Sequence, residues 1–79
     1  MRFYSLGPMA TRVNAHITGT VWKIEVKVGD AVAEGQTVVI LESMKMEMPV
    51  EATLAGTVTA VLVKEGDPIQ EGAGVVEIG

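Results

Sequence analysis

The sequence repeats itself after 37 positions, and the two copies align without a gap. The first copy spans residues 12–41 and the second spans residues 49–78. A repeat of this size is usually one supersecondary unit that cannot bury its apolar face alone. Two copies can bury these faces against each other, so the repeat predicts one domain of two similar halves. The matching positions are Val13 and Val50, Ala15 and Ala52, Gly19-Thr20-Val21 and Gly56-Thr57-Val58, Val26-Lys27 and Val63-Lys64, Gly29-Asp30 and Gly66-Asp67, Glu34-Gly35 and Glu71-Gly72, and Val38-Val39 and Val75-Val76.

Each copy has the pattern of short strands separated by turns. Residues 22–28 alternate between apolar and charged side chains, which is the period of a half-buried strand. Residues 38–41 and 75–78 are short runs rich in β-branched side chains. The dipeptides Gly29-Asp30 and Gly66-Asp67 are turn signals, because Gly takes a positive φ without steric cost. We predict an all-β domain of two antiparallel sheets, related by a pseudo-two-fold axis, with the midpoint of the chain as a connecting hairpin.

Composition limits what can stabilise such a domain and what it can bind. The 79 residues include no Cys and one His, so neither a disulfide nor a standard structural metal site can form. The net charge is −4 and the six basic residues are not clustered, which excludes a nucleic-acid surface. No apolar run has the length that spans a bilayer or forms a signal peptide. We therefore expect a soluble, cytoplasmic protein that is monomeric in isolation.

The N-terminal residues lie outside the repeat. We interpret residues 1–11 as an N-terminal tail or a cloning remnant, with Met9 as a candidate natural start. Residues 12–79 form the predicted domain.

The segment between the two copies, residues 42–48, does not fit the turn that it must make. Tight two-residue hairpins favour Asn-Gly or Asp-Gly, because a positive φ is needed there. This segment instead contains Glu, Met and Lys, which favour helices. Seven residues ahead of Pro49 are too few for a stable helix. A turn is therefore expected against local preference, and such conflicts are often found at functional sites.

The centre of this segment is one lysine, Lys45. A lysine in water is almost entirely ammonium at neutral pH. Lys45 is thus a poor nucleophile on its own, and the chain offers no acid–base pair, metal-ligand set or phosphate loop. We expect no catalytic residues and no enzymatic activity. Lys45 is instead suited to be the substrate of an enzyme that deprotonates and acylates it.

The run Glu42-Ser43-Met44-Lys45-Met46-Glu47 strongly resembles the biotin attachment motif, in which a Met-Lys-Met triplet presents the lysine at a hairpin. From Val13 to the C-terminus the Gly and Val pattern resembles that of biotinyl and lipoyl domains. The resemblance implies a flattened β-barrel, or barrel-sandwich hybrid, of two antiparallel four-stranded sheets.

The resemblance also implies a function. Lys45 would be biotinylated by a biotin protein ligase, with Met44 and Met46 as flanking recognition residues. The biotin would then carry CO2 from a biotin carboxylase to a carboxyltransferase. The two copies align without a gap, so we predict that the short protruding thumb of the bacterial acetyl-CoA carboxylase carrier is missing. This resembles the biotinyl domains of pyruvate, propionyl-CoA or methylmalonyl-CoA-linked carboxylases, or small free-standing carriers.

Two alternatives remain open. A lipoyl carrier, or one that accepts both cofactors, shares the fold, but lipoyl sites typically read Asp-Lys-Ala, and Met44 and Met46 favour biotin. The other alternative is a β module of the same fold that carries no cofactor. That would be the better interpretation of an arbitrary exposed lysine, but the Met-Lys-Met triplet at the repeat midpoint reverses the preference.

Other side chains have simpler interpretations. His16 is an ordinary surface or strand-end residue, and Glu42 and Glu47 are solubilising charges, with ligase recognition as the weaker alternative. Trp22, whose repeat partner is Thr59, is expected to pack in the core or at an edge, or to dock a partner if exposed.

Overall fold

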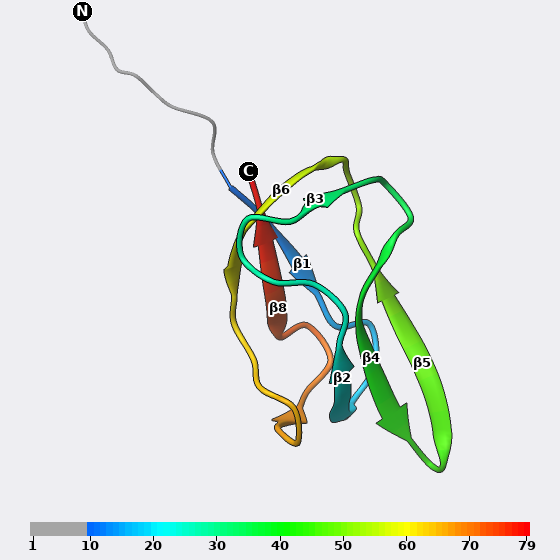
Figure 1. The fold of residues 1–79 in the computed structure, drawn as a ribbon. Coiled ribbons are helices and arrows are strands. Elements are labelled where there is room, and N and C mark those ends of the chain that lie inside the picture. The colour runs from blue at the N-terminus through cyan, green and yellow to red at the C-terminus, as the bar shows by residue number, and fades with distance from the viewer. Residues whose placement is uncertain (1–9) are drawn as a thin grey trace, which may run out of the picture.

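The computed structural model describes residues 10–79, and all regular structure in this range is β-strand (Figure 1). The strands are β1 (Thr11–Asn14), β2 (Gly19–Ile24), β3 (Ala31–Val32), β4 (Thr37–Ser43), β5 (Met46–Glu51), β6 (Gly56–Val61), β7 (Pro68–Ile69) and β8 (Gly74–Ile78). Strand β1 begins at Thr11, one residue ahead of the predicted domain start. Ala10 precedes the first strand, and residues 1–9 of the predicted tail, including Met9, lie outside the described residues.

The strands form two antiparallel four-stranded sheets. We call the sheet with order β5-β4-β2-β7 the hairpin sheet, and the sheet with order β1-β8-β6-β3 the terminal sheet. Each sheet takes two strands from each half of the chain. Neither half can therefore form a complete sheet alone. The predicted all-β fold of two four-stranded sheets is confirmed.

The pseudo-two-fold symmetry extends to the pairing register. Val13 pairs with Val76 in the terminal sheet, and the equivalent Val50 pairs with Val39 in the hairpin sheet. The irregularities repeat as well, because a bulge follows Val21 in β2 and its equivalent in β6. Equivalent positions in the two halves therefore have the same backbone environment and can serve as internal controls for each other.

The core between the sheets is apolar and consists mainly of valine. No charged or polar residue is buried among residues 10–79. Full burial of one such aliphatic side chain contributes about 1.5 to 3 kcal/mol, so the core supplies the main stabilisation of a small domain without disulfides. The buried residues are Val13, Ala15, Val21, Val26, Val32, Val38, Val39, Leu41, Val50, Ala52, Val58, Ile69, Val75, Val76 and Ile78.

The predicted glycine turns are present in both halves. In the first half the Asp30 carboxylate accepts a hydrogen bond from the Lys27 N–H at 3.0 Å, and Asp67 and Lys64 repeat this bond at 2.9 Å. Four glycines have a positive φ that strains other residues: Gly29 (97°), Gly35 (86°), Gly66 (93°) and Gly72 (92°). These turns confirm the predicted strand breaks.

The strand predicted over residues 22–28 is wrong beyond Ile24, where β2 ends. Val21 is buried, and the bulge between Val21 and Lys23 shifts the alternation that the sequence pattern suggested. Trp22 falls in this bulge and is 47% exposed, so core packing was the wrong interpretation of it. Val28, predicted to share its buried face, is 62% exposed.

The β4–β5 turn and the ends of the described chain lie at opposite ends of the molecule. Figure 1 shows the β4–β5 turn at one end of the molecule and the start of β1 and the end of β8 at the opposite end. Residues 10–79 include no helix long and apolar enough to cross a membrane.

Candidate functional site

The Met-Lys-Met triplet lies at the tip of the β4–β5 hairpin. Ser43 pairs with Met46, which leaves Met44 and Lys45 as a two-residue turn. Their φ angles are 53° and 64°, and two consecutive positive values are the signature of a type I′ hairpin turn. For residues other than Gly this conformation costs roughly 1 to 2 kcal/mol each. The expected turn against local preference is thus present, and it is confined to two residues because Glu42 and Glu47 continue the strands.

The side chains at this tip are open to solvent. Met44 is 91% exposed and Met46 is 61% exposed, and Lys45 is also exposed. Within residues 10–79 the Lys45 ammonium takes part in no ion pair. An incoming enzyme can therefore surround the amine without first breaking contacts to the protein.

The stem of the hairpin is anchored in the core on one face only. Side chains alternate along β5, so Met46, Met48 and Val50 share a face. Val50 is buried and Met48 is half-buried, so this face leads from the core toward the tip. The opposite, outer face carries Glu47 and Pro49, which are exposed.

Two glutamates face each other across the outer side of the stem. Glu42 pairs directly with Glu47, and both are exposed. Like charges opposite each other in a sheet are destabilising. The arrangement leaves a small acidic pair beside the turn, and their interpretation as solubilising charges stays a prediction.

Gly19 in β2 packs against the end of β4, next to the turn of the hairpin. A Cβ atom at Gly19 would lie 2.6 Å from the Glu42 carbonyl oxygen and 3.4 Å from the Ser43 Cβ atom. Only glycine fits this approach of β2 to the end of β4. The sequence marked Gly19 as one of the repeated glycines, but its contact with the hairpin follows only from the sheet pairing.

The site is arranged to present a single group. The turn brings Met44, Lys45 and Met46 together at one tip, while His16 is an exposed residue outside the hairpin. Among the described residues no group of three acidic or histidine side chains could hold a metal ion. What the hairpin offers is one accessible primary amine on a rigid support, and an amine in this position is suited to covalent modification.

Comparison with known proteins defines the class. Residues 8–78 match the model of the biotin/lipoyl family described as "Biotin-requiring enzyme". This match covers most of the chain, so the protein belongs to that family.

Relatives from other organisms are similar over somewhat less than half of the chain. The biotin/lipoyl attachment protein of Bacillus subtilis is 53% identical over 38 residues, which are 48% of this chain and 52% of that protein. The 1.3S subunit of methylmalonyl-CoA carboxyltransferase of Propionibacterium freudenreichii subsp. shermanii is 60% identical over 35 residues, 44% of this chain and 28% of that subunit. The chain thus spans about half the length of the first relative and less of the second.

Solved structures extend the similarity to the whole fold. The urea carboxylase of Kluyveromyces lactis superposes with a TM-score of 0.86 at 37% identity, over 100% of this chain and 7% of the carboxylase chain. A single-chain, multi-domain long-chain acyl-CoA carboxylase gives a TM-score of 0.82 at 28% identity, over 96% of this chain and 8% of that chain. The fold is therefore one that these large carboxylases contain as a small part.

Proposed function

We propose that the protein is a biotin carboxyl carrier and that biotin is attached covalently to Lys45. The observation that carries this proposal is the exposed Lys45 between Met44 and Met46, held in a two-residue turn at the tip of the hairpin. Membership of the biotin/lipoyl family and the similarity to a urea carboxylase support it. The strained turn is exposed and contributes no side chain to the core, so the packing of the domain does not explain it. Presentation of Lys45 is its best explanation.

The attachment step forms one amide bond. A biotin protein ligase joins the carboxyl group of biotin to a nucleotide from a nucleoside triphosphate, with release of pyrophosphate. The Lys45 ammonium loses a proton, its Nζ atom attacks the activated carbon, and the nucleotide leaves as the nitrogen gives up a second proton. The product is neutral, so the charge of Lys45 is lost. Met44 and Met46 flank the amine with exposed apolar side chains and serve in recognition by the ligase.

The chain itself contributes presentation and a tether. Biotin carries the carboxyl group when bound, while the hairpin holds the attachment point away from the body of the domain. A lysine tether of this kind raises the effective concentration of the cofactor at successive active sites that it can reach. The partners are the ligase, then a biotin carboxylase and a carboxyltransferase. We propose a monomeric domain that acts in the cytoplasm.

A lipoyl carrier is the second candidate. The observation in its favour is the similarity to a Bacillus subtilis protein that is named for both biotin and lipoyl attachment. The same exposed amine could accept either acyl group, and the Met residues on both sides of Lys45 favour biotin.

The decisive test is the intact mass of the protein. The chain is co-expressed with a bacterial biotin protein ligase, and the Lys45→Arg variant is treated in the same way. We expect one biotinyl group on the wild type, complete loss of labelling in the variant, and the same melting temperature for both, because Lys45 is exposed and the exchange keeps the charge. A labelled Lys45→Arg protein would refute the site, and a mass gain that matches lipoyl would favour the second candidate.

A further inference from the structure

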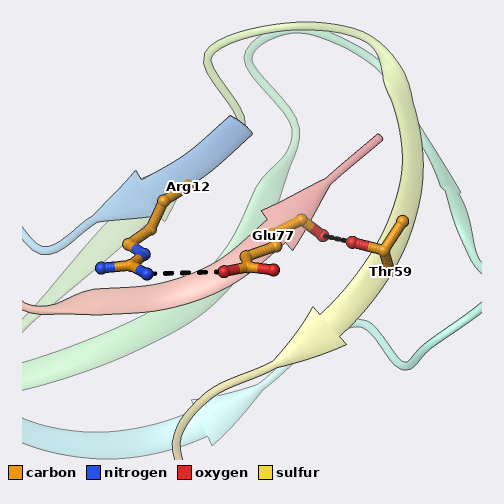
Figure 2. A network of polar contacts seen from close by, with 3 residues as sticks. All are labelled: Arg12, Thr59 and Glu77. Carbon is orange, nitrogen blue, oxygen red and sulfur yellow. Dashed lines mark hydrogen bonds and ion pairs between the residues drawn. The ribbon is translucent and has the colours of Figure 1, made fainter. Parts of the chain in front are cut away.

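The outer faces of the two sheets differ at equivalent positions. On the terminal sheet, Figure 2 shows Arg12 reaching Glu77, with 3.6 Å between Nη2 and Oε2, and the Thr59 hydroxyl donating to the Glu77 carbonyl oxygen at 3.2 Å. On the hairpin sheet the equivalent residues are apolar. The equivalent pairs are Arg12 and Pro49, Thr59 and Trp22, and Glu77 and Ile40.

The fold does not require this difference. Arg12 pairs with Glu77 in the same register in which Pro49 pairs with Ile40. Polar side chains are therefore compatible with this backbone geometry. Trp22 in β2 is 47% exposed and Pro49 in β5 is exposed, with β4 between them, so both apolar side chains face water. The apolar side chains at these three positions of the hairpin sheet are best explained by a binding partner outside the domain.

An open groove lies on the outer face of the hairpin sheet and includes two of these apolar positions, Ile40 and Pro49. It has a volume of about 470 Å³ and is lined by Glu25, Gln36, Thr37, Ile40, Glu47 and Pro49. Glu47 is two residues from Lys45, and Pro49 is four residues from it, or about 13 Å along an extended strand. A protein that binds this groove is thus within reach of the lysine at the tip.

The charges around the groove define what fits it. Glu25 and Glu47 are exposed on its walls, and Glu42 lies opposite Glu47. Lys23, which pairs with Ile40, is the basic residue of β2 on this face. A groove that places Ile40 and Pro49 between the acidic Glu25 and Glu47 is complementary to a protein surface that carries apolar side chains among Lys and Arg.

We propose that this outer face of the hairpin sheet is the docking surface of the biotin protein ligase that acylates Lys45. The docking surface consists of Trp22, Ile40 and Pro49, with Glu25 and Glu47 as its acidic rim. The proposal rests on the proposed function. Before acylation the domain carries no cofactor, so a ligase must take its binding energy from protein surface near Lys45, whereas later enzymes can also bind the biotin.

The test exchanges the two outer faces. The triple variant Trp22→Thr, Ile40→Glu, Pro49→Arg gives the hairpin sheet the side chains that the terminal sheet already tolerates. The matched control, Thr59→Trp with Glu77→Ile, places the apolar side chains of the hairpin sheet at two of the three equivalent positions of the terminal sheet. Initial rates of biotin incorporation by a purified bacterial biotin protein ligase are measured against carrier concentration.

We expect the triple variant to raise KM by about tenfold or more, the equivalent of about 1.4 kcal/mol, with kcat little changed. The control should stay close to the wild type. Labelling of the wild type should also slow as salt is added, and this dependence should weaken in a Glu25→Gln, Glu47→Gln variant, because rim charges act mainly through steering.

Three results would overturn the docking surface. The first is an unchanged kcat/KM in the triple variant. The second is an equal loss in the control. The third is sedimentation showing that the wild type dimerises through this face and that the triple variant is monomeric. If the triple variant melts early, single Trp22→Thr and Ile40→Glu variants replace it and should each raise KM severalfold. A wild type that is never labelled contradicts the proposed function instead.

Discussion

Two equivalent strand pairs, β4 with β5 and β8 with β1, have the same register but end differently. At one end Leu41 of β4 pairs with Met48 of β5, and at the other the equivalent Ile78 of β8 pairs with Thr11 of β1. From Leu41 the hairpin continues for two more pairs and turns at Lys45, whereas β8 stops at Ile78. The scaffold is therefore symmetric, and the features that bear on function lie in what was added to one copy of it.

The largest expected effect comes from breaking the support of the hairpin. Gly19→Val should cost about 3 kcal/mol of unfolding free energy, because the new side chain overlaps the Glu42 carbonyl of β4. We expect hydrogen exchange to rise at the amides of β4 and β5 and the labelling of Lys45 to slow. Urea unfolding and exchange measured by NMR check this.

The matched control is the equivalent Gly56→Val. Its Cβ would meet the Ile78 Cγ2 atom at 2.7 Å and the Gly79 carbonyl oxygen at 3.1 Å, at the other end of the molecule. It should also destabilise the fold but leave exchange in the hairpin stem unchanged at temperatures well below unfolding. Equal loosening of the stem in both variants would show that Gly19 has no special role there.

The turn glycines sharpen the comparison, because they should behave identically. Gly29 and Gly66 have φ of 97° and 93°, and a Cβ atom at either position meets nothing within 4 Å. The cost of Gly29→Val or Gly66→Val is therefore backbone strain alone, about 1 to 2 kcal/mol. Thermal or urea unfolding should give the same loss for both variants. A difference well above 0.5 kcal/mol would mean that the halves are not energetically equivalent.

The residues beside Lys45 test the asymmetric end directly. Met44→Asp together with Met46→Ala moves the triplet toward the lipoyl type and removes two exposed apolar side chains. We expect biotinylation by a biotin protein ligase to slow about fivefold, or by about 1 kcal/mol, with little change in melting temperature. Met48→Leu, on the same strand but half-buried, is the control. Unchanged labelling of the double variant would mean that Met is not a determinant.

The smallest effect is expected at the polar outer face. Arg12 and Glu77 form an ion pair across 3.6 Å with the Arg12 side chain 60% exposed. Exposed pairs of this kind contribute at most about 1 kcal/mol, so Arg12→Ala should lower the melting temperature only slightly, and less at high salt. A large loss would show that this pair, and not only the core, stabilises the terminal sheet.

Much of the fold was predictable from the repeat. The glycine turns, the β-branched runs at residues 38–41 and 75–78, and the exposed Lys45 all lie where local signals placed them. The extent of β2 was not predictable, because the bulge after Val21 depends on pairing with β4 and leaves no mark in the alternation of side chains. The length of the connecting turn was not predictable either. Glu42 and Glu47 belong to the strands because they pair with each other across β4 and β5.

The sequence by itself determined that two equivalent halves exist and that a lysine between two methionines separates them, because repeats and motifs are properties of residue order. Tertiary structure decided which strands share a sheet, that Gly19 lies against Glu42, and that Trp22, Ile40 and Pro49 belong to three neighbouring strands of the sheet that carries the Lys45 hairpin. These contacts join residues far apart in the chain, and their geometry arises only when both halves interleave around one apolar core.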